Sequence, residues 1–222
     1  MSLMLSDFVA IDDLLHKDQF KGLEVLDLFG KGLEAWLKAF LDSLGYGSGV
    51  QIDGEVAPSS VLEGRVYVAK GAKVEPHAYV KGPAYIGPGA EVRHAAYIRG
   101  NVYVGPEAVV GHTTEVKGAV FFDGAKAGHF AYVGDSLLGR DVNLGAGTKL
   151  ANLRLANDEV LIKDPLSGKA LATGLRKFGS IVSDLAQTGC NAVLSPGSIL
   201  MPGTCVLPCV HFRGTLTKGI AR

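Results

Sequence analysis

Residues 62–98 read LEGRVYVAKGAKVEPHAYVKGPAYIGPGAEVRHAAYI, and every sixth residue from Leu62 onward is a large aliphatic one. The same step of six continues in both directions. It comprises Val50, Val56, Leu62, Val68, Val74, Val80, Ile86, Val92, Ile98, Val104, Val110, Val116 and Phe122. An α-helix would scatter residues at this spacing around its surface, and a single strand of this length would far exceed the strands of known proteins. The period therefore predicts a solenoid with a straight side every six residues.

Three such sides close one triangular coil of about 18 residues, in which each aliphatic side chain points inward and stacks on its equivalent in the next coil. Small residues four positions later suit the crowded corners: Ala72, Ala78, Ala84, Ala90, Ala96 and Ala108. Many of the 30 glycines fall at the expected corners, where a positive φ is often needed. We therefore expect a mainly β fold, a parallel β-helix over residues 50–215.

The step of six is interrupted twice. It slips near residues 123–137, resumes at Leu138, Leu144 and Leu150, and breaks again over residues 153–180. A solenoid accommodates extra residues as a bulge at a corner. We expect an inserted loop or hairpin at 153–180 that projects from one corner, and such insertions often carry function.

Residues 1–45 follow a different pattern and predict an N-terminal helical segment. Apolar residues recur there at helical spacing, namely Phe20, Leu23, Leu26, Leu33, Leu37, Phe40 and Leu41. Gly30 and Gly32 are expected to separate two helices, and the loop SLGYGSG (43–49) to mark the boundary. We expect this segment to pack on the end of the β-helix or on a partner subunit.

The composition excludes several classes of partner. Lys and Arg together number 22, as do Asp and Glu, which gives no reason to expect binding to nucleic acid or to an acidic membrane. No apolar run is long enough for a transmembrane helix, and the N-terminus is too acidic for a secretory signal. The cysteines, Cys190, Cys205 and Cys209, include no CxxC pair. We interpret them as thiols of a cytoplasmic protein, packed as small hydrophobic residues.

Two blocks are more specific than the repeat, KAGHFAYVGDSLLGRDVNLGAGTKLANLRL (126–155) and RKFGSIVSDLAQTGCNAVLSPGSILMPG (176–203). Through them residues 80–205 resemble the acetyltransferase domain of bifunctional N-acetylglucosamine-1-phosphate uridyltransferases and, more closely, the archaeal-type sugar-1-phosphate nucleotidylyltransferase/acetyltransferases. The resemblance implies a left-handed β-helix, usually a homotrimer, that transfers an acetyl group from acetyl-CoA to an amino-sugar phosphate or nucleotide sugar, with no metal. The family's nucleotidyltransferase domain and its glycine-rich loop have no counterpart here, so we expect no uridylyltransferase activity.

Acetyl transfer to an amine requires a base and hydrogen-bond donors for the oxyanion of the thioester. Histidine is the natural base near neutral pH. Of the six histidines, His129 matches the family's catalytic histidine in the block that begins KAGH, and the resemblance implies that it is the general base. It also places Tyr132 and Asn152 in the catalytic site, although Tyr132 also fits ordinary packing at a rim and Asn152 an ordinary corner ladder.

Arg99 and Lys117 lie 18 residues apart, so they stack on adjacent coils about 4.8 Å apart. Two stacked cations repel unless an anion lies between them, and both residue types bind phosphate. The alternative is an ion pair with Glu115 or Glu91. The resemblance assigns Arg99 and Lys117 to a sugar-phosphate site, together with two more substrate-binding residues, Asn143 and Lys177.

The resemblance places the acetyl-CoA thioester against Gly145, Ala146 and Cys190. Glycine and alanine allow a ligand to approach the backbone closely, although Gly145 and Ala146 also fit a plain corner. Cys190 takes the position of a small polar residue in the family. We do not interpret it as a nucleophile, because this class transfers the acetyl group directly.

Two other functions fit the same scaffold. One is a non-catalytic β-helix that binds a sugar phosphate or a protein partner. The other is a zinc site of the carbonic-anhydrase type between subunits, because His94, His112 and His129 are spaced 18 and 17 residues apart and two of them can stack on adjacent coils.

Overall fold

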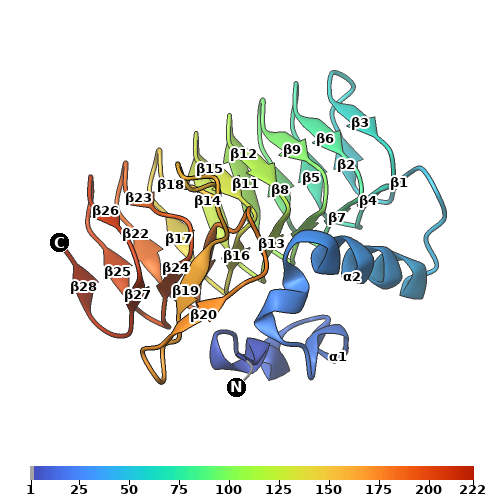
Figure 1. The fold of residues 1–222 in the computed structure, drawn as a ribbon. Coiled ribbons are helices and arrows are strands. Elements are labelled where there is room, and N and C mark those ends of the chain that lie inside the picture. The colour runs from blue at the N-terminus through green and yellow to red at the C-terminus, as the bar shows by residue number, and fades with distance from the viewer. Residues whose placement is uncertain (1–2) are drawn as a thin grey trace.

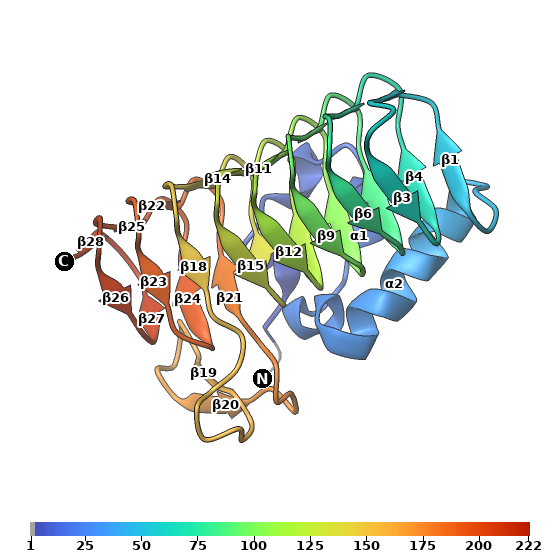
Figure 2. The ribbon, with the colours of Figure 1, turned by 90° about the horizontal axis from the view of Figure 1, so that it is seen from above.

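The structure, a computed structural model, describes residues 3–222. The chain winds into a triangular prism with three parallel sheets as its faces, and short helices lie along one side of it (Figure 1; Figure 2). The predicted mainly β, left-handed parallel β-helix is confirmed. No helix among residues 3–222 has the length and apolar character needed to cross a membrane.

Each coil contributes one strand to each sheet in turn. The first sheet contains β1 (Val50–Ile52), β4 (Val66–Val68), β7 (Ala84–Ile86), β10 (Val102–Val104), β13 (Ala119–Phe121), β16 (Leu137–Leu138), β21 (Ser180–Val182), β24 (Ser198–Leu200) and β27 (Thr215–Leu216). The second contains β2 (Glu55–Val56), β5 (Lys73–Val74), β8 (Glu91–Val92), β11 (Val109–His112), β14 (Lys126–His129), β17 (Asn143–Leu144), β22 (Gln187–Thr188), β25 (Cys205–Val206) and β28 (Ile220–Ala221). The third contains β3 (Val61–Glu63), β6 (Tyr79–Lys81), β9 (Tyr97–Arg99), β12 (Glu115–Lys117), β15 (Tyr132–Gly134), β18 (Lys149–Leu150), β23 (Val193–Leu194) and β26 (His211–Phe212). Strands thus continue past residue 215, where we expected the coils to end.

The residues of the six-residue step fill the interior of the prism. From Val68 to Val116 all of them are buried in one apolar cluster, with Val56 and Leu62 packed against it. The two ends of the series differ. Val50 is exposed, and Phe122 points outward while its neighbour Phe121 fills the interior position.

The change at Phe122 has its origin at one corner, between the third and first sheets. Tyr97 pairs with Glu115, a spacing of 18 residues, whereas Val102 pairs with Ala119, a spacing of 17. The corner after β12 is Gly118 alone, where the preceding coil has Gly100 and Asn101. The next coil is shortened in the same way at Asp135, because Val120 pairs with Leu137. The slip therefore begins before the expected region.

The N-terminal segment covers the outer face of the first sheet. It contains the 3-10 turns η1 (Leu5–Asp7), η2 (Ile11–Asp13) and η3 (Val25–Leu28) and the helices α1 (Lys17–Phe20) and α2 (Gly30–Ser43). Tyr67, Tyr85, Tyr103 and Phe122 project outward from the sheet and pack with Phe20, Trp36 and Phe40. The segment therefore packs along a side of the prism and not on its end (Figure 1). The two glycines do not separate two helices, because α2 begins at Gly30 and includes Gly32.

One histidine of this segment is half-buried against the sheet. The Nε2 atom of His16 lies 2.9 Å from the hydroxyl oxygen of Tyr85, and its ring packs edge-on against Phe40. Burial lowers the pKa of His16 below its ordinary value of 6.5. The unfolded chain thus takes up a proton at a higher pH than the folded chain does.

We expect the free energy of unfolding to fall as the pH decreases through about 6.5 and to level off below the folded-state pKa of His16. Urea denaturation at pH 7.5 and pH 5.5, as rough brackets of this window, measures the effect. The His16→Gln variant is the control, because glutamine at position 16 does not titrate in this pH range. An equal loss of stability in the variant would assign the pH dependence to other groups.

The insertion contains a hairpin of β19 (Leu161–Lys163) and β20 (Ala170–Ala172). The hairpin leaves the corner between β18 and β21 and folds back onto the prism. Val160, Ile162 and Phe178 are buried in the same outer cluster as the N-terminal helices, and Phe178 stacks on Phe29 with ring centroids 4.1 Å apart. The insertion is therefore anchored on the first sheet.

Candidate functional site

A first cleft of about 530 Å³ runs along the second sheet, and we call it the His129 cleft. His129 is exposed at the end of β14, where the chain turns toward the third sheet. The cleft brings together five of the predicted site residues: His129, Asn143, Gly145, Ala146 and Cys190. The expected acetyl-CoA residues thus lie beside the expected base.

Small residues give this cleft its shape. A Cβ atom on Gly145 would lie 2.5 Å from the carbonyl carbon of Gly189, so glycine is required where two coils meet. His129 pairs in register with His112, and their rings lie edge to face with centroids 5.6 Å apart. Within residues 3–222, no three His, Cys, Asp or Glu side chains are grouped to hold a metal ion.

A second cleft of about 330 Å³ lies at the shortened corners, and we call it the cationic cleft. Arg99, Lys117 and Lys177 line it, whereas Asn143, the fourth residue predicted to bind the substrate, lines the His129 cleft. Lys31 and Glu34 of α2 form the opposite wall. The stack of Phe29 on Phe178 holds the start of α2 next to the end of the insertion, so Lys31 and Lys177 share one rim.

A buried carboxylate organises the floor of the cationic cleft. Asp135 is 8% exposed and accepts two hydrogen bonds from the Lys117 ammonium, at 2.8 and 3.0 Å. The Nδ2 atom of Asn152 donates to Asp135 Oδ2 at 2.5 Å, and the Tyr132 hydroxyl donates to Asn152 Oδ1 at 3.3 Å. Burial and, secondarily, the nearby charges of Glu115 and Asp135 raise the pKa of Tyr132. Tyr132 therefore stays neutral and can donate a hydrogen bond.

Arg99 forms an ion pair with Glu115 at 2.7 Å, which is the alternative that the sequence left open. This hydrogen bond raises the pKa of Arg99. The pair is more than a third exposed on both sides, so it contributes little to stability and can rearrange around an anion.

The predicted residues therefore separate into two groups within one chain. His129 and Asn143 line the first cleft, whereas Arg99, Lys117 and Lys177 line the second, and the two linings share no residue. Tyr132 and Asn152 belong with the second group through Asp135. Sequence reasoning missed Asp135 and Lys31. The slip of the repeat could have indicated Asp135, but no local pattern marks Lys31.

The cysteines differ from our expectation of small packed residues. Cys190 and Cys209 are exposed and Cys205 is partly exposed, and none forms a disulfide. Cys190 lines the His129 cleft, so its thiol faces the space next to Ala146.

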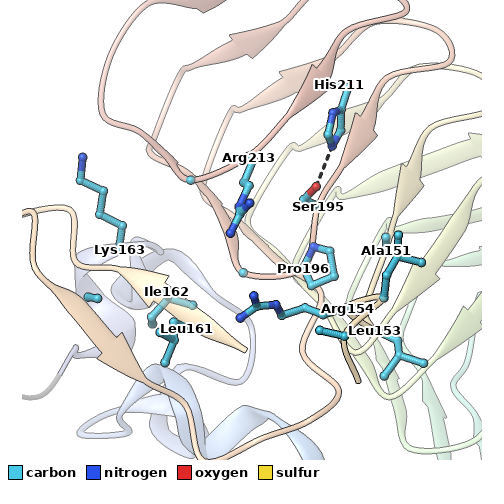
Figure 3. Close-up of a pocket in the computed structure, with 15 residues that line it drawn as sticks. Ala151, Leu153, Arg154, Leu161, Ile162, Lys163, Ser195, Pro196, His211 and Arg213 are labelled. Atoms are coloured by element: carbon cyan, nitrogen blue, oxygen red, sulfur yellow. Dashed lines mark hydrogen bonds between the residues drawn. The ribbon is translucent and has the colours of Figure 1, made fainter. Parts of the chain in front are cut away.

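A third and larger cavity, of about 740 Å³, lies between the inserted hairpin and the last coils (Figure 3). It contains none of the residues predicted from the sequence. We call it the hairpin cavity.

Comparison with known proteins agrees with the repeat and with the first of the two blocks, residues 126–155. The GMPPB C-terminal domain family matches residues 80–170. The bifunctional sugar-1-phosphate nucleotidylyltransferase/acetyltransferase of Sulfurisphaera tokodaii is 44% identical over 78 residues, which are 35% of this chain and 19% of that protein. The bifunctional protein GlmU of Methanococcus aeolicus is 30% identical over 191 residues, which are 85% of this chain and 45% of that protein.

Among solved structures, the UDP-N-acetylglucosamine acyltransferase of Francisella novicida superposes with a TM-score of 0.50 at 13% identity, over 72% of this chain and 59% of that one. At this identity the likeness concerns the fold alone. The chain spans less than half the length of the curated relatives described above. The chain is similar to a part of the bifunctional sugar-1-phosphate nucleotidylyltransferase/acetyltransferases and GlmU proteins.

Proposed function

We propose that this protein is an acetyltransferase that moves an acetyl group from acetyl-CoA directly to the amine of an amino-sugar phosphate, with His129 as the general base. The observation that carries the proposal is the combination of two clefts. One presents an imidazole beside a floor of small residues, and the other gathers four cations around a polar network.

The acceptor side of the proposal rests on charge. Lys31, Arg99, Lys117 and Lys177 line the cationic cleft together with the carboxylates of Glu34 and Asp135. Even with Glu115 paired to Arg99, positive charge is in excess. A sugar phosphate carries up to two negative charges, and Arg and Lys are the residues that bind such groups. Tyr132 and Asn152 supply hydrogen-bonding groups beside it, which suit sugar hydroxyls.

The chemical step is an aminolysis of a thioester. The amine nitrogen attacks the acetyl carbonyl carbon, a C–N bond forms, and the C–S bond breaks to release the CoA thiolate. His129 accepts the proton that the amine loses. Gly145 and Ala146 leave room for the thioester to approach the backbone.

The proposal places the working site between copies of the chain. The His129 cleft and the cationic cleft lie on different parts of one prism, so one copy would supply the base and its neighbour the phosphate site. A homotrimer closes such head-to-tail contacts by symmetry. The outer faces of the second and third sheets are free for this contact, since the helices of residues 3–43 cover only the first.

A thiol-release assay tests the activity. Acetyl-CoA is mixed with glucosamine-1-phosphate or galactosamine-1-phosphate, and the free CoA thiol is titrated. We expect release that depends on both substrates. No release with either amino sugar, together with stabilisation by the sugar phosphate but not by acetyl-CoA in thermal unfolding, would instead identify a sugar-phosphate binding module.

The Lys177→Gln and Lys31→Gln variants are each expected to raise the KM for the sugar phosphate by roughly tenfold, because each loses one charged contact to the phosphate. Lys38→Gln is the matched control, since Lys38 is exposed on the same helix and does not line the cleft. Steady-state kinetics with the sugar phosphate varied at saturating acetyl-CoA gives the KM of each variant. An unchanged KM in both cleft variants would show that the phosphate binds outside the cationic cleft.

A further inference from the structure

The hairpin cavity is built by the insertion and the C-terminal coils. Its walls are residues 151–156 and the β19 strand on one side, and the corners at 195–197 and 211–214 on the other. The hairpin is fixed in place, because Val160 and Ile162 are buried and the Thr215 hydroxyl donates to the Lys163 carbonyl at 2.5 Å. A Cβ atom on Gly197 would lie 2.6 Å from the carbonyl oxygen of Leu161, so the hairpin lies directly on the coil. The cavity is thus preformed.

Its charge is of one sign. Arg154, Lys163 and Arg213 line the cavity, and no Asp or Glu is among its lining residues. Arg154 has one ion pair, a partly exposed one with Asp158 at 3.1 Å. None of the ion pairs among residues 3–222 includes Lys163 or Arg213. Figure 3 shows the two guanidinium groups extending into the space between β19 and the coils. Like charges gathered around one space favour an anion in it.

Three leucines of the lining are open to solvent. Leu153 is 43% exposed, Leu161 50%, and Leu155 is fully exposed, and all three line this cavity. Large exposed aliphatic side chains that gather around one cavity commonly mark a binding surface. Cations beside leucines match a ligand with a charged head and an apolar body.

One polar pair completes the lining. Ser195 Oγ and His211 Nε2 are hydrogen-bonded at 2.7 Å at the upper edge of the cavity (Figure 3). The hydroxyl and the imidazole can each take part in a hydrogen bond with a further oxygen of a ligand.

We propose that the hairpin cavity is a binding site for an organic phosphate, separate from the two clefts of the acetyltransferase proposal. Arg154 and Arg213 hold the phosphate group, Lys163 adds charge at the rim, and the leucines contact the apolar body of the ligand. The lining of this cavity has no residue in common with the His129 cleft or the cationic cleft. The observations that support this site are therefore independent of those that support the proposed reaction.

Phenyl phosphate is a suitable probe, because it joins a phosphate to an apolar ring. It is titrated into the full chain carrying Lys31→Gln and Lys177→Gln, which weakens anion binding at the cationic cleft. NMR of labelled leucine methyl groups is expected to show shifts at Leu155 and Leu161 that saturate, and inorganic phosphate is expected to bind at least tenfold more weakly. Adding Arg154→Gln and Arg213→Gln is expected to weaken phenyl phosphate binding at least tenfold, while Lys218→Gln, an exposed cation outside the cavity, leaves it unchanged.

Three results would overturn the proposal. The first is methyl shifts confined to residues outside the cavity. The second is binding that survives the loss of both arginines. The third is a Leu155→Ser variant that changes the oligomeric state of the protein and does not bind phenyl phosphate. The cavity would then be an interface between copies. Competition by acetyl-CoA distinguishes two sources of the bound ligand, the phosphorylated end of the acyl donor and a separate small molecule, and either source satisfies the proposal.

Discussion

The His129→Ala variant is expected to lose a factor of roughly 10²–10⁴ in kcat for acetyl transfer, with little change in the KM for the sugar phosphate. The reason is the separation of the two clefts, since the proposed phosphate-binding residues do not line the cleft that contains His129. Steady-state kinetics by thiol release measures the effect. The His112→Ala variant is the control, because it removes the stacked neighbour of His129 and leaves the base.

The same variant tests whether two copies build one site. His129→Ala and Lys117→Ala proteins are each expected to be nearly inactive. When the two are unfolded together and reassembled at equal amounts, about a quarter of the sites of a random trimer receive His129 from one chain and Lys117 from the next. Recovery of activity to about that level supports the shared site. If the mixture is as inactive as the two parent variants, either both residues act within one chain or the proposed acetyl transfer is wrong.

The Gly111→Ala variant is expected to be destabilised by about 3 kcal/mol or more, because its Cβ atom would lie 1.8 Å from the backbone oxygen of Gly128 on the next coil. A backbone atom in the middle of a sheet cannot move away without separating β11 from β14. The melting temperature is then lowered by roughly 6–12 °C.

Gly128→Ala is the matched control for this prediction. Gly128 lies opposite Gly111 in the same pair of strands, yet a Cβ atom there meets nothing within 4 Å. We expect its melting temperature to stay within a degree or two, roughly, of the parent. Equal destabilisation of both variants in a thermal scan would show that loss of glycine as such is responsible, and not the close approach of two coils.

The sequence predicts the scaffold because the interior of a β-helix repeats the same contact. One inward side chain in six must be large and apolar at every coil, so the signal accumulates along the chain. The places where the sequence failed are those where the contact is not repeated. Phe122 continued the count of six, yet the single-residue corner at Gly118 turned it outward. Only the pairing of the strands shows at which corner the coil is one residue shorter.

Some residues of the candidate site could likewise be predicted from the sequence, and others could not. Gly145, Cys190 and His129 could be grouped because the resemblance to the acetyltransferase domains assigns all three to one site, and all three line the His129 cleft. Lys31 could not be assigned to a site from the sequence, because it reaches the cationic cleft through α2. The position of α2 depends on a tertiary contact between Phe29 and Phe178. The slip of the repeat could have drawn attention to Asp135, but its role became visible only through its partners, Lys117 and Asn152.

The corner between the third and first sheets differs in length from coil to coil. Between the strands it holds Gly100 and Asn101 in one coil, Gly118 alone in the next, Asp135 and Ser136 in the third, and the whole of 151–179 between β18 and β21. The strands on either side keep their pairing in every case. This edge is therefore the part of the molecule where chain length can vary without disturbing the core. The cationic cleft and the hairpin cavity both lie on it, so descendants of this chain could acquire new ligands by insertions and deletions here, and new loops could be grafted at the same edge.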